Sequence, residues 1–343
     1  MKKVRLITGY VLFLSCFFVG EAKAVQKLKF VLWATPKSAH ELSLREFAKL
    51  VGKKTNGKTI IEVINGIEGR IPIKEGLTIV RSGRYDGAVI PALLIARFFP
   101  KLATLSFPFL FADEEHVDKT VYGKIGQNLL MELSETTRVK GLAFLEDGFL
   151  DIGSAKQPIK EPADFEEISI NIIQPIGGFS FKALLAHPVR VAATEVIQAL
   201  QKGIVNSTEL MIYSGSLRDF VKISAAIIPY LSYLSLTKHS YETNVMVINL
   251  DRFNNLRETG KRALLESAEE ISKLNAAEVR KGREEILERL RSKGVIIVHP
   301  NRVAIRKTLN NVFENPPKGI SKNLLIQIKN ACRLPPFCGS VFQ

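Results

Sequence analysis

The sequence predicts an α/β fold with two lobes, joined by strands that cross between them and spanned by one long helix. Its 343 residues suggest two domains. Apolar segments of strand length alternate with amphipathic segments of helix length, which is typical of sheets built with helical crossovers. One amphipathic pattern continues from about 256 to 292, far beyond an ordinary helix. A two-lobed α/β protein of this kind has a cleft, and ligands usually bind in such clefts.

The first part of the chain contains a β-α-β-α-β unit, which favours parallel strands. Strands are expected at 28–35, 59–64 and 85–91, and helices at 39–54 and 72–82. Asn56-Gly57 turns the chain between the first helix and the second strand. After this unit we expect a helix that begins with the acids of DEEHVDK, a helix over 124–137 and a strand over 141–154.

A second unit of similar composition follows. Strands are expected at 169–174, 204–209, 233–249 and 295–300, and helices at 178–187, 193–203, 256–292 and 301–313. RKGREEILERLRSK (280–293) alternates in charge and is interpreted as the solvent-facing side of the long helix. We place lobe I at 25–150 plus about 237–275, lobe II at 151–236 plus about 276–315, and a C-terminal tail at 316–343.

The N-terminus has the pattern of a secretory signal peptide. A basic stretch, KKVR, precedes the apolar run 6–20, and Ala22-Lys23-Ala24 fits a small-x-small cleavage site. We expect residues 1–24 to be removed and the mature protein to be exported to the periplasm, since no later apolar run reaches membrane length. The alternative is a lipid anchor on Cys16, with FLSC as a lax lipoprotein motif.

The cysteines and the charge fit an exported protein. Cys332 and Cys338 lie close together in ACRLPPFC, so an oxidising compartment favours a small disulfide loop, with two free thiols as the alternative. The net charge of +14 would attract anionic surfaces. Nucleic acid is not an expected partner, because no stretch combines basic clusters with interleaved aromatic residues.

The motifs of common enzyme and cofactor sites are missing from the sequence. The five histidines are scattered without HExxH spacing or a Cys/His cluster, and the sequence has no GxSxG element or P-loop. His239 in TKHSY is interpreted as a hydrogen-bonded structural histidine. The sequence therefore predicts a binding protein without enzymatic activity, cofactor or metal.

Several segments together resemble a known transport family. FPFLF before an acid-rich helix start, the hairpin PIKEPADF and EVIQALQKGIV, within 27–315, resemble the extracytoplasmic substrate-binding subunit of tripartite ATP-independent periplasmic (TRAP) transporters of the dicarboxylate/sialate-binding type. The resemblance implies the bilobal periplasmic-binding-protein fold, with two α/β lobes that close on a ligand. It also implies a membrane permease as partner and, for a divergent subfamily, a periplasmic TPR-repeat protein.

Two arginines that the resemblance leads one to expect are missing. The strand after the EDGF element usually carries one, where this chain has Leu150. The strand after the PxD turn carries another, which pairs with the ligand carboxylate, where this chain has Asn171. A guanidinium gives a carboxylate two parallel charge-assisted hydrogen bonds. Leucine and asparagine cannot replace that interaction.

At the other positions that face the ligand in the family, this chain also has less polar residues. Polar or charged side chains of the family give way to apolar ones, and the aromatic residue that usually packs on the ligand becomes Ala193. The candidate ligand-binding residues are Trp33, Val89, Ile90, Leu94, Leu150, Asn171, Ala193 and Leu210. Ile73 is a further candidate, because the alignment of residues 66–80 with the family can shift by one residue.

The combined changes predict an apolar cleft. A slot lined by Trp, Leu, Ile and Val suits an alkyl chain, so we expect a hydrophobic ligand, fatty-acid-like or lipid-like. The first alternative is a small organic acid held by a relocated basic residue, with Arg97, Lys182 and Arg190 as candidates. The second alternative is a scaffold protein that has kept the fold and lost transport.

Overall fold

The computed structural model describes residues 25–215 and 226–331. Its strands are β1 (Gln26–Leu32), β2 (Thr59–Asn65), β3 (Gly87–Pro91), β4 (Val139–Ser154), β5 (Ser169–Asn171), β6 (His187–Val189), β7 (Ser207–Met211), β8 (Tyr233–Asn249) and β9 (Ile296–Val298). Its α-helices are α1 (Ala39–Lys54), α2 (Gly76–Arg81), α3 (Ala92–Ile95), α4 (Glu114–Thr120), α5 (Lys124–Thr137), α6 (Gly177–Ala183), α7 (Val196–Gln201), α9 (Leu250–Asn254), α10 (Glu258–Ser292), α11 (Arg302–Thr308), α12 (Asn310–Glu314) and α13 (Lys322–Ala331). Short 3-10 helices are η1 (Ile73–Glu75), η2 (Pro100–Ser106), η3 (Pro162–Phe165) and η4 (Ile228–Tyr230).

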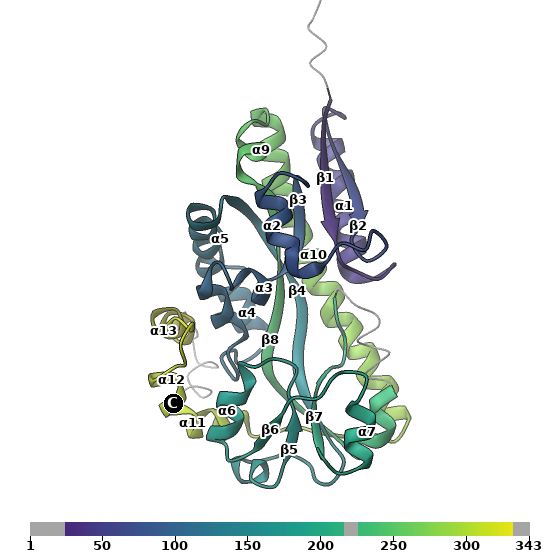
Figure 1. Cartoon of the computed structure of the whole chain (residues 1–343), viewed down its shortest axis with the longest axis vertical. Coiled ribbons are helices and arrows are strands. Elements are labelled where there is room, and N and C mark those ends of the chain that lie inside the picture. Colours follow the sequence, from purple (N-terminus) through teal and green to yellow (C-terminus); the bar gives the residue numbers. More distant parts are fainter. Residues whose placement is uncertain (1–24, 216–225, 332–343) are drawn as a thin grey trace, which may run out of the picture.

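All nine strands of the described residues join one sheet, in the order β2-β1-β3-β8-β4-β7-β5-β6, with β9 beside β8. The antiparallel strands β4 and β8 form its centre and are 16 and 17 residues long. We call the half built on β1, β2 and β3 lobe I, and the half built on β5, β6 and β7 lobe II. Because β4 and β8 pass through both halves (Figure 1), the expected bilobal fold with crossing strands is confirmed.

Lobe I follows directly from its sequence pattern. β1 pairs in parallel with β2 and β3, as a β-α-β-α-β unit requires. The Ser38 hydroxyl caps α1 by accepting a hydrogen bond from the Glu41 amide at 3.3 Å. The apolar face of α1 packs on the sheet, where the rings of Phe30 and Phe47 lie 5.7 Å apart between centroids. The predicted helix over 39–54 is confirmed at both ends.

Lobe II has shorter strands than the sequence suggests. β5 ends at Asn171, whereas the apolar pattern predicts a strand to 174. The reason is a side chain: the backbone amides of Ile173 and Gln174 donate to the Glu209 carboxylate instead of to a neighbouring strand. This contact bends the chain away from the sheet just after Asn171 and carries it toward α6.

The long helix α10 braces both lobes. Its 35 residues run along the sheet past β4 (Figure 1), which confirms the predicted lobe-spanning helix. Small and apolar residues such as Ala268 and Ile271 form its buried face, and the Ser272 hydroxyl donates to the Phe144 carbonyl oxygen at 2.7 Å. The charged stretch 280–293 is only partly a solvent-facing surface, because Arg283 is 5% exposed and points inward.

Within the expected tail at 316–343, the described helix α13 packs firmly against the rest of the protein. Leu325 and Ile328 of α13 are buried in the core, and His116 Nε2 of α4 donates to the Ile328 carbonyl oxygen at 2.9 Å. The signal peptide with Cys16, and the expected Cys332–Cys338 disulfide, lie outside the described residues. Within the described residues, no helix is both long and apolar enough to cross a membrane.

Candidate ligand-binding site

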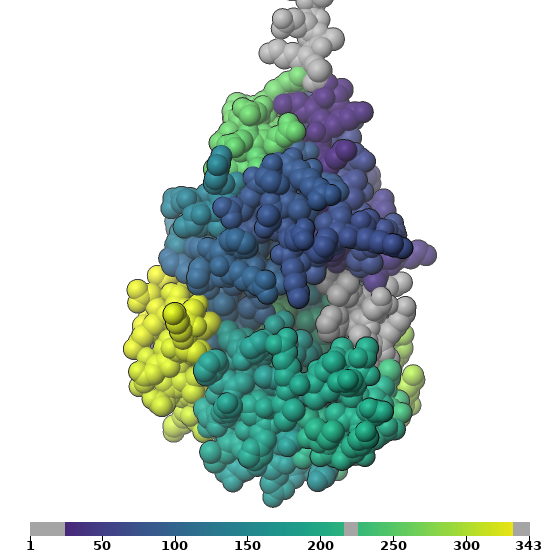
Figure 2. Space-filling view, in the orientation of Figure 1, coloured from purple at the N-terminus to yellow at the C-terminus, as the bar shows by residue number. Residues whose placement is uncertain are grey.

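A cavity of about 270 Å³ lies where residues of both lobes meet. Figure 2 shows the two lobes facing each other on this side of the molecule, with lobe I in blue above lobe II in teal. The cavity is lined by Leu32, Trp33, His40, Ile73, Val89, Pro91, Leu93, Leu94, Asp147, Leu150, Ile173, Gln174, Met211, Glu242, Thr243 and Asn244. Most of this surface is apolar, and none of the described lining residues is a lysine or an arginine.

Trp33 forms a fixed aromatic wall of this interlobe cavity. Its indole Nε1 donates to the Ile71 carbonyl oxygen at 2.7 Å, and only 5% of the residue is exposed. Gly66 and Gly76 make room for the ring, since a Cβ atom at either glycine would lie within 3.0 Å of it. Trp33 is the single tryptophan of the chain, so its fluorescence reports on this cavity.

Strand alternation decides which residues of β3 face the cavity. Val89 lines it, whereas Ile90 is fully buried in the core and lines neither this cavity nor the second one described below. Successive side chains of a strand point to opposite faces, so both neighbours cannot contact the ligand. Leu94 of α3 and Leu150 of β4 do line the interlobe cavity, as expected from the sequence.

A β-bulge places an acid in the same cavity. In the β4–β8 ladder, Glu146 pairs with Thr243 and Gly148 pairs with Glu242, so Asp147 is an extra residue on β4. A bulge of this kind re-aims a side chain, and Asp147 lines the cavity, where it accepts a hydrogen bond from the Ser214 hydroxyl at 2.8 Å. Sequence reasoning missed Asp147, although the Gly148 beside it, with φ of +124°, is a signal for an irregular strand.

Two further titratable side chains line the cavity and were also missed. His40 is fully buried, and its Nε2 donates to the Glu146 carbonyl oxygen at 2.9 Å. Burial lowers the pKa of His40, which keeps the imidazole neutral. Its Nδ1 has no hydrogen-bond partner among the described residues. Burial also raises the pKa of Glu242 to about 8, although the Ser240 hydroxyl donates to it at 2.8 Å.

The shifted pKa of Glu242 predicts how stability depends on pH. Between pH 4.5 and about 8 the folded protein holds a proton on Glu242 that the unfolded chain has lost, so the free energy of unfolding falls as pH rises. Glu242→Gln is expected to remove this slope. Urea denaturation of both proteins across that range measures it. An identical pH slope in the variant and the wild type would contradict the assignment.

A second cavity of about 240 Å³ lies beside the first, within lobe II. The two cavities share Ile173 and Met211 in their walls. Three predicted ligand-binding residues line the second cavity and not the first, namely Asn171, Ala193 and Leu210. The sequence therefore places its candidate residues around two adjoining cavities.

Asn171 has a structural role that explains how a neutral side chain fills this position. Its amide nitrogen donates to the Thr208 hydroxyl at 3.0 Å, and its amide oxygen accepts from the Val191 backbone amide at 3.0 Å. Asn171 thus ties β5 to β7 and to the segment after β6. The Asn171 side chain therefore holds the backbone together at this position.

Of the three basic residues considered as relocated ligand anchors, Arg190 lines the second cavity. Arg97 and Lys182 are exposed and line neither of the two cavities. An acid, Glu209, also lines the second cavity. Its Oε1 lies 3.1 Å from His239 Nε2, and its Oε2 accepts hydrogen bonds from the backbone amides of Ile173 and Gln174. His239 is fully buried and also bonds Thr237 at 2.8 Å, so its predicted structural role is confirmed.

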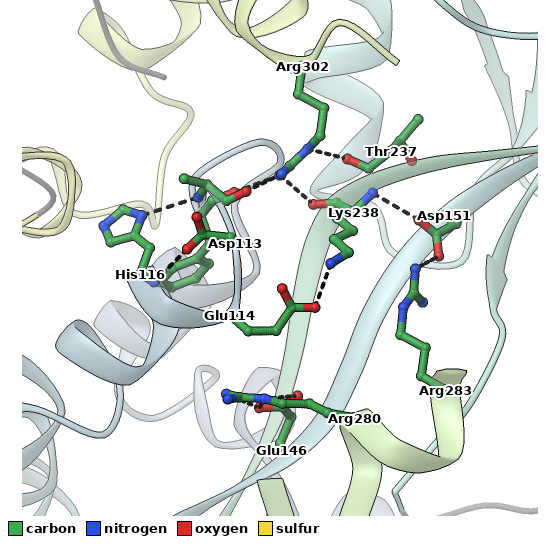
Figure 3. Close-up of polar contacts among 12 residues, drawn as sticks. Asp113, Glu114, His116, Glu146, Asp151, Thr237, Lys238, Arg280, Arg283 and Arg302 are labelled. Carbon is green, nitrogen blue, oxygen red and sulfur yellow. Dashed lines mark hydrogen bonds and ion pairs between the residues drawn. The ribbon is translucent and has the colours of Figure 1, made fainter. Parts of the chain in front are cut away.

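A charged network joins α4, β4, β8, α10 and α11 away from these cavities (Figure 3). Arg280 Nη2 lies 2.9 Å from a Glu146 oxygen and 2.7 Å from an Asp118 oxygen, while Lys238 contacts Glu114 at 2.6 Å.

Arg283 and Arg302 complete the network. Arg283 pairs with Asp151 at 2.5 Å, and Arg302 donates to the carbonyl oxygens of Phe111, Ala112 and Thr237. Since these contacts tie α4, α10 and α11 to the central strands β4 and β8, the network is a structural brace.

Two α/β lobes on crossing strands, with a cavity between them, are the architecture of a bilobal solute-binding protein. The chain belongs to the family of bacterial extracellular solute-binding proteins, family 7 (DctP), whose profile matches residues 30–316. The family is a non-enzymatic component of periplasmic transport, which confirms the TRAP resemblance and the prediction that the chain is not an enzyme. TRAP solute-binding proteins bind small ligands and interact with membrane permease subunits.

Curated relatives are named for organic acids. The chain is 28% identical over 314 residues to the 2,3-diketo-L-gulonate-binding periplasmic protein YiaO of Escherichia coli, covering 90% of this chain and 92% of the relative. It is 25% identical over 266 residues to the C4-dicarboxylate-binding protein DctB of Bacillus subtilis, covering 77% and 73%.

Solved structures share the fold. A TRAP periplasmic solute-binding protein from Ochrobactrum anthropi matches with a TM-score of 0.82 at 21% identity, covering 90% of this chain and 95% of that one. The sugar acid binding protein DctPAm from Advenella mimigardefordensis, in complex with galactonate, matches with a TM-score of 0.71 at 22% identity, covering 90% and 98%.

Proposed function

We propose that this TRAP solute-binding protein binds a hydrophobic solute in its interlobe cavity. The observation that carries the proposal is the cavity wall. Trp33, Val89, Leu94 and Leu150 provide apolar surface, and none of the described lining residues is a lysine or an arginine. Burial of apolar surface is then the main source of binding free energy that this cavity offers.

The polar side chains of the cavity disfavour a small dicarboxylate. Neither Asp147 nor Glu242, which holds its proton up to about pH 8, offers a cationic partner, so a ligand carboxylate beside them would lie uncompensated in a partly desolvated space. The relatives named for diketogulonate and C4-dicarboxylates take organic acids. This chain differs at Leu150 and Asn171, where the resemblance leads one to expect arginines.

Chain length is expected to set the affinity. Each buried methylene contributes about 0.8 kcal/mol, so adding two carbons to a fatty acid is expected to tighten binding up to about 15-fold. The gain stops when the cavity is full. A series from octanoate to tetradecanoate, titrated against Trp33 fluorescence, measures this dependence.

The same titration tests the proposed function against the organic acids of the relatives. Dodecanoate is expected to change the fluorescence of Trp33 at micromolar concentration, whereas succinate and galactonate leave it unchanged. Trp33→Phe is the control for signal from elsewhere. Tight binding of succinate or galactonate, with no response to dodecanoate, would overturn the hydrophobic-ligand proposal.

The family implies a membrane permease as the transport partner, and we predict a second partner in the periplasm. A membrane permease would receive the solute when the lobes open. A periplasmic TPR-repeat protein is our further predicted partner for the divergent subfamily. Co-purification of the exported protein from its native host, with mass spectrometry of bound proteins, tests that prediction.

A further inference from the structure

The two cavities lie side by side and share part of their walls. They meet at Ile173 and Met211, which contribute to the walls of both. One cavity measures about 270 Å³ and the other about 240 Å³. A flexible alkyl chain can pass between two apolar side chains, and the methionine adapts its shape more readily than a branched residue. An elongated ligand therefore fits this arrangement better than a compact one.

The two ends of this joint site differ in charge. The interlobe cavity contains the acid Asp147 and a Glu242 that is protonated below about pH 8, with no lysine or arginine among its described lining residues, while the second cavity contains Arg190. Arg190 is exposed and has no ion-pair partner among the described residues. The acid in its own cavity, Glu209, is engaged with His239 and with backbone amides. An anionic group on a ligand is thus favoured at the Arg190 end and disfavoured at the other.

Asn171 helps to place Arg190. Because the Asn171 side chain accepts a hydrogen bond from the Val191 amide at 3.0 Å, the backbone next to Arg190 is fixed to β5. The guanidinium is the only arginine or lysine side chain among the described residues that line either cavity. A planar guanidinium suits a carboxylate because it offers two parallel donors.

From this polarity we infer the class and orientation of the ligand: an amphiphilic monocarboxylate, with its carboxylate at Arg190 in the second cavity and its alkyl chain passing Ile173 and Met211 toward Trp33. The inference rests on the proposed function, which supplies the hydrophobic ligand. It adds that the ligand carries one anionic end and that this end lies in lobe II, away from the interlobe acids.

Substitution of Arg190 tests the anionic end. Dodecanoate is expected to bind wild-type protein about fivefold more tightly than methyl dodecanoate, because an exposed arginine contributes a modest ion pair. Arg190→Gln is expected to abolish this difference between the acid and the ester by weakening the binding of dodecanoate. Arg97→Gln removes an exposed arginine that lines neither cavity and serves as the matched control.

Brominated fatty acids test the orientation. Bromine quenches tryptophan fluorescence at close range, and Trp33 is the only tryptophan. Dodecanoate that carries bromine on its terminal carbon is expected to quench Trp33 strongly, and 2-bromododecanoate only weakly. The reverse order would place the carboxylate in the interlobe cavity and overturn the inference.

The outcomes separate the two proposals. If acid and ester bind equally, and Arg190→Gln changes neither, the hydrophobic-ligand proposal holds and the anionic end is wrong. If dodecylamine binds more tightly than dodecanoate, the acids of the interlobe cavity select the ligand and the inference fails. If neither dodecanoate nor its ester binds to the wild type, the proposed function itself fails, and the inference fails with it.

Discussion

Arg283→Met is expected to lower the free energy of unfolding by about 3 to 5 kcal/mol, the largest effect of any single substitution considered for this protein. The Arg283 and Asp151 side chains are 6% and 0% exposed and lie 2.5 Å apart. Removing the guanidinium leaves the Asp151 carboxylate buried without its cationic partner. Methionine preserves much of the side-chain volume, so the loss comes mainly from the uncompensated charge. Urea denaturation measures it.

The matched control is an exposed ion pair on the same helix. Lys273 and Glu269 are 71% and 72% exposed, and Lys273→Met is expected to change the free energy of unfolding by less than about 1 kcal/mol. Equal losses for the two variants would contradict the view that Arg283 fastens α10 to β4.

Leu94→Asp is expected to weaken the binding of methyl dodecanoate by about 30-fold or more, equivalent to about 2 kcal/mol. Leu94 lines the interlobe cavity and is partly exposed, so the variant is expected to fold. A carboxylate on this wall has to lose water when an alkyl chain enters. The ester carries no charge, so the loss measures desolvation instead of repulsion. Trp33 fluorescence provides the readout.

Ile67→Asp controls for the effect of the added charge. Ile67 is 47% exposed and lines neither of the two cavities. Its substitution is expected to leave the affinity for the ester within about twofold of the wild type. Unchanged binding in Leu94→Asp would show that the chain does not pass this wall, and would contradict the apolar-cavity account.

The strongly periodic elements could be predicted from the sequence alone. The strand over 233–249 and the helix over 124–137 have the predicted bounds, and α10 begins within two residues of its expected start. Long patterns of one period leave little choice of structure. The charged stretch of α10 was less predictable, because an alternating charge pattern does not reveal that Arg283 meets a buried acid on β4.

Most residues of the candidate site could be predicted from the sequence, but their arrangement around two separate cavities could not. The resemblance gives Leu150 and Asn171, yet the two residues line different cavities. It also gives Ile90, which strand alternation turns into the core. Asp147 escaped prediction because a bulge in β4 decides its direction. Bulges and shared cavity walls depend on contacts between distant segments, which periodicity does not encode.

The most direct measurement is organic extraction of the natively purified mature protein, followed by mass spectrometry of what it releases. An apolar cavity that binds a hydrophobic solute predicts an acyl-chain species in about equal amount to the protein. Recovery of a stoichiometric dicarboxylate or sugar acid would contradict this account of the cavity around Trp33 and Leu150.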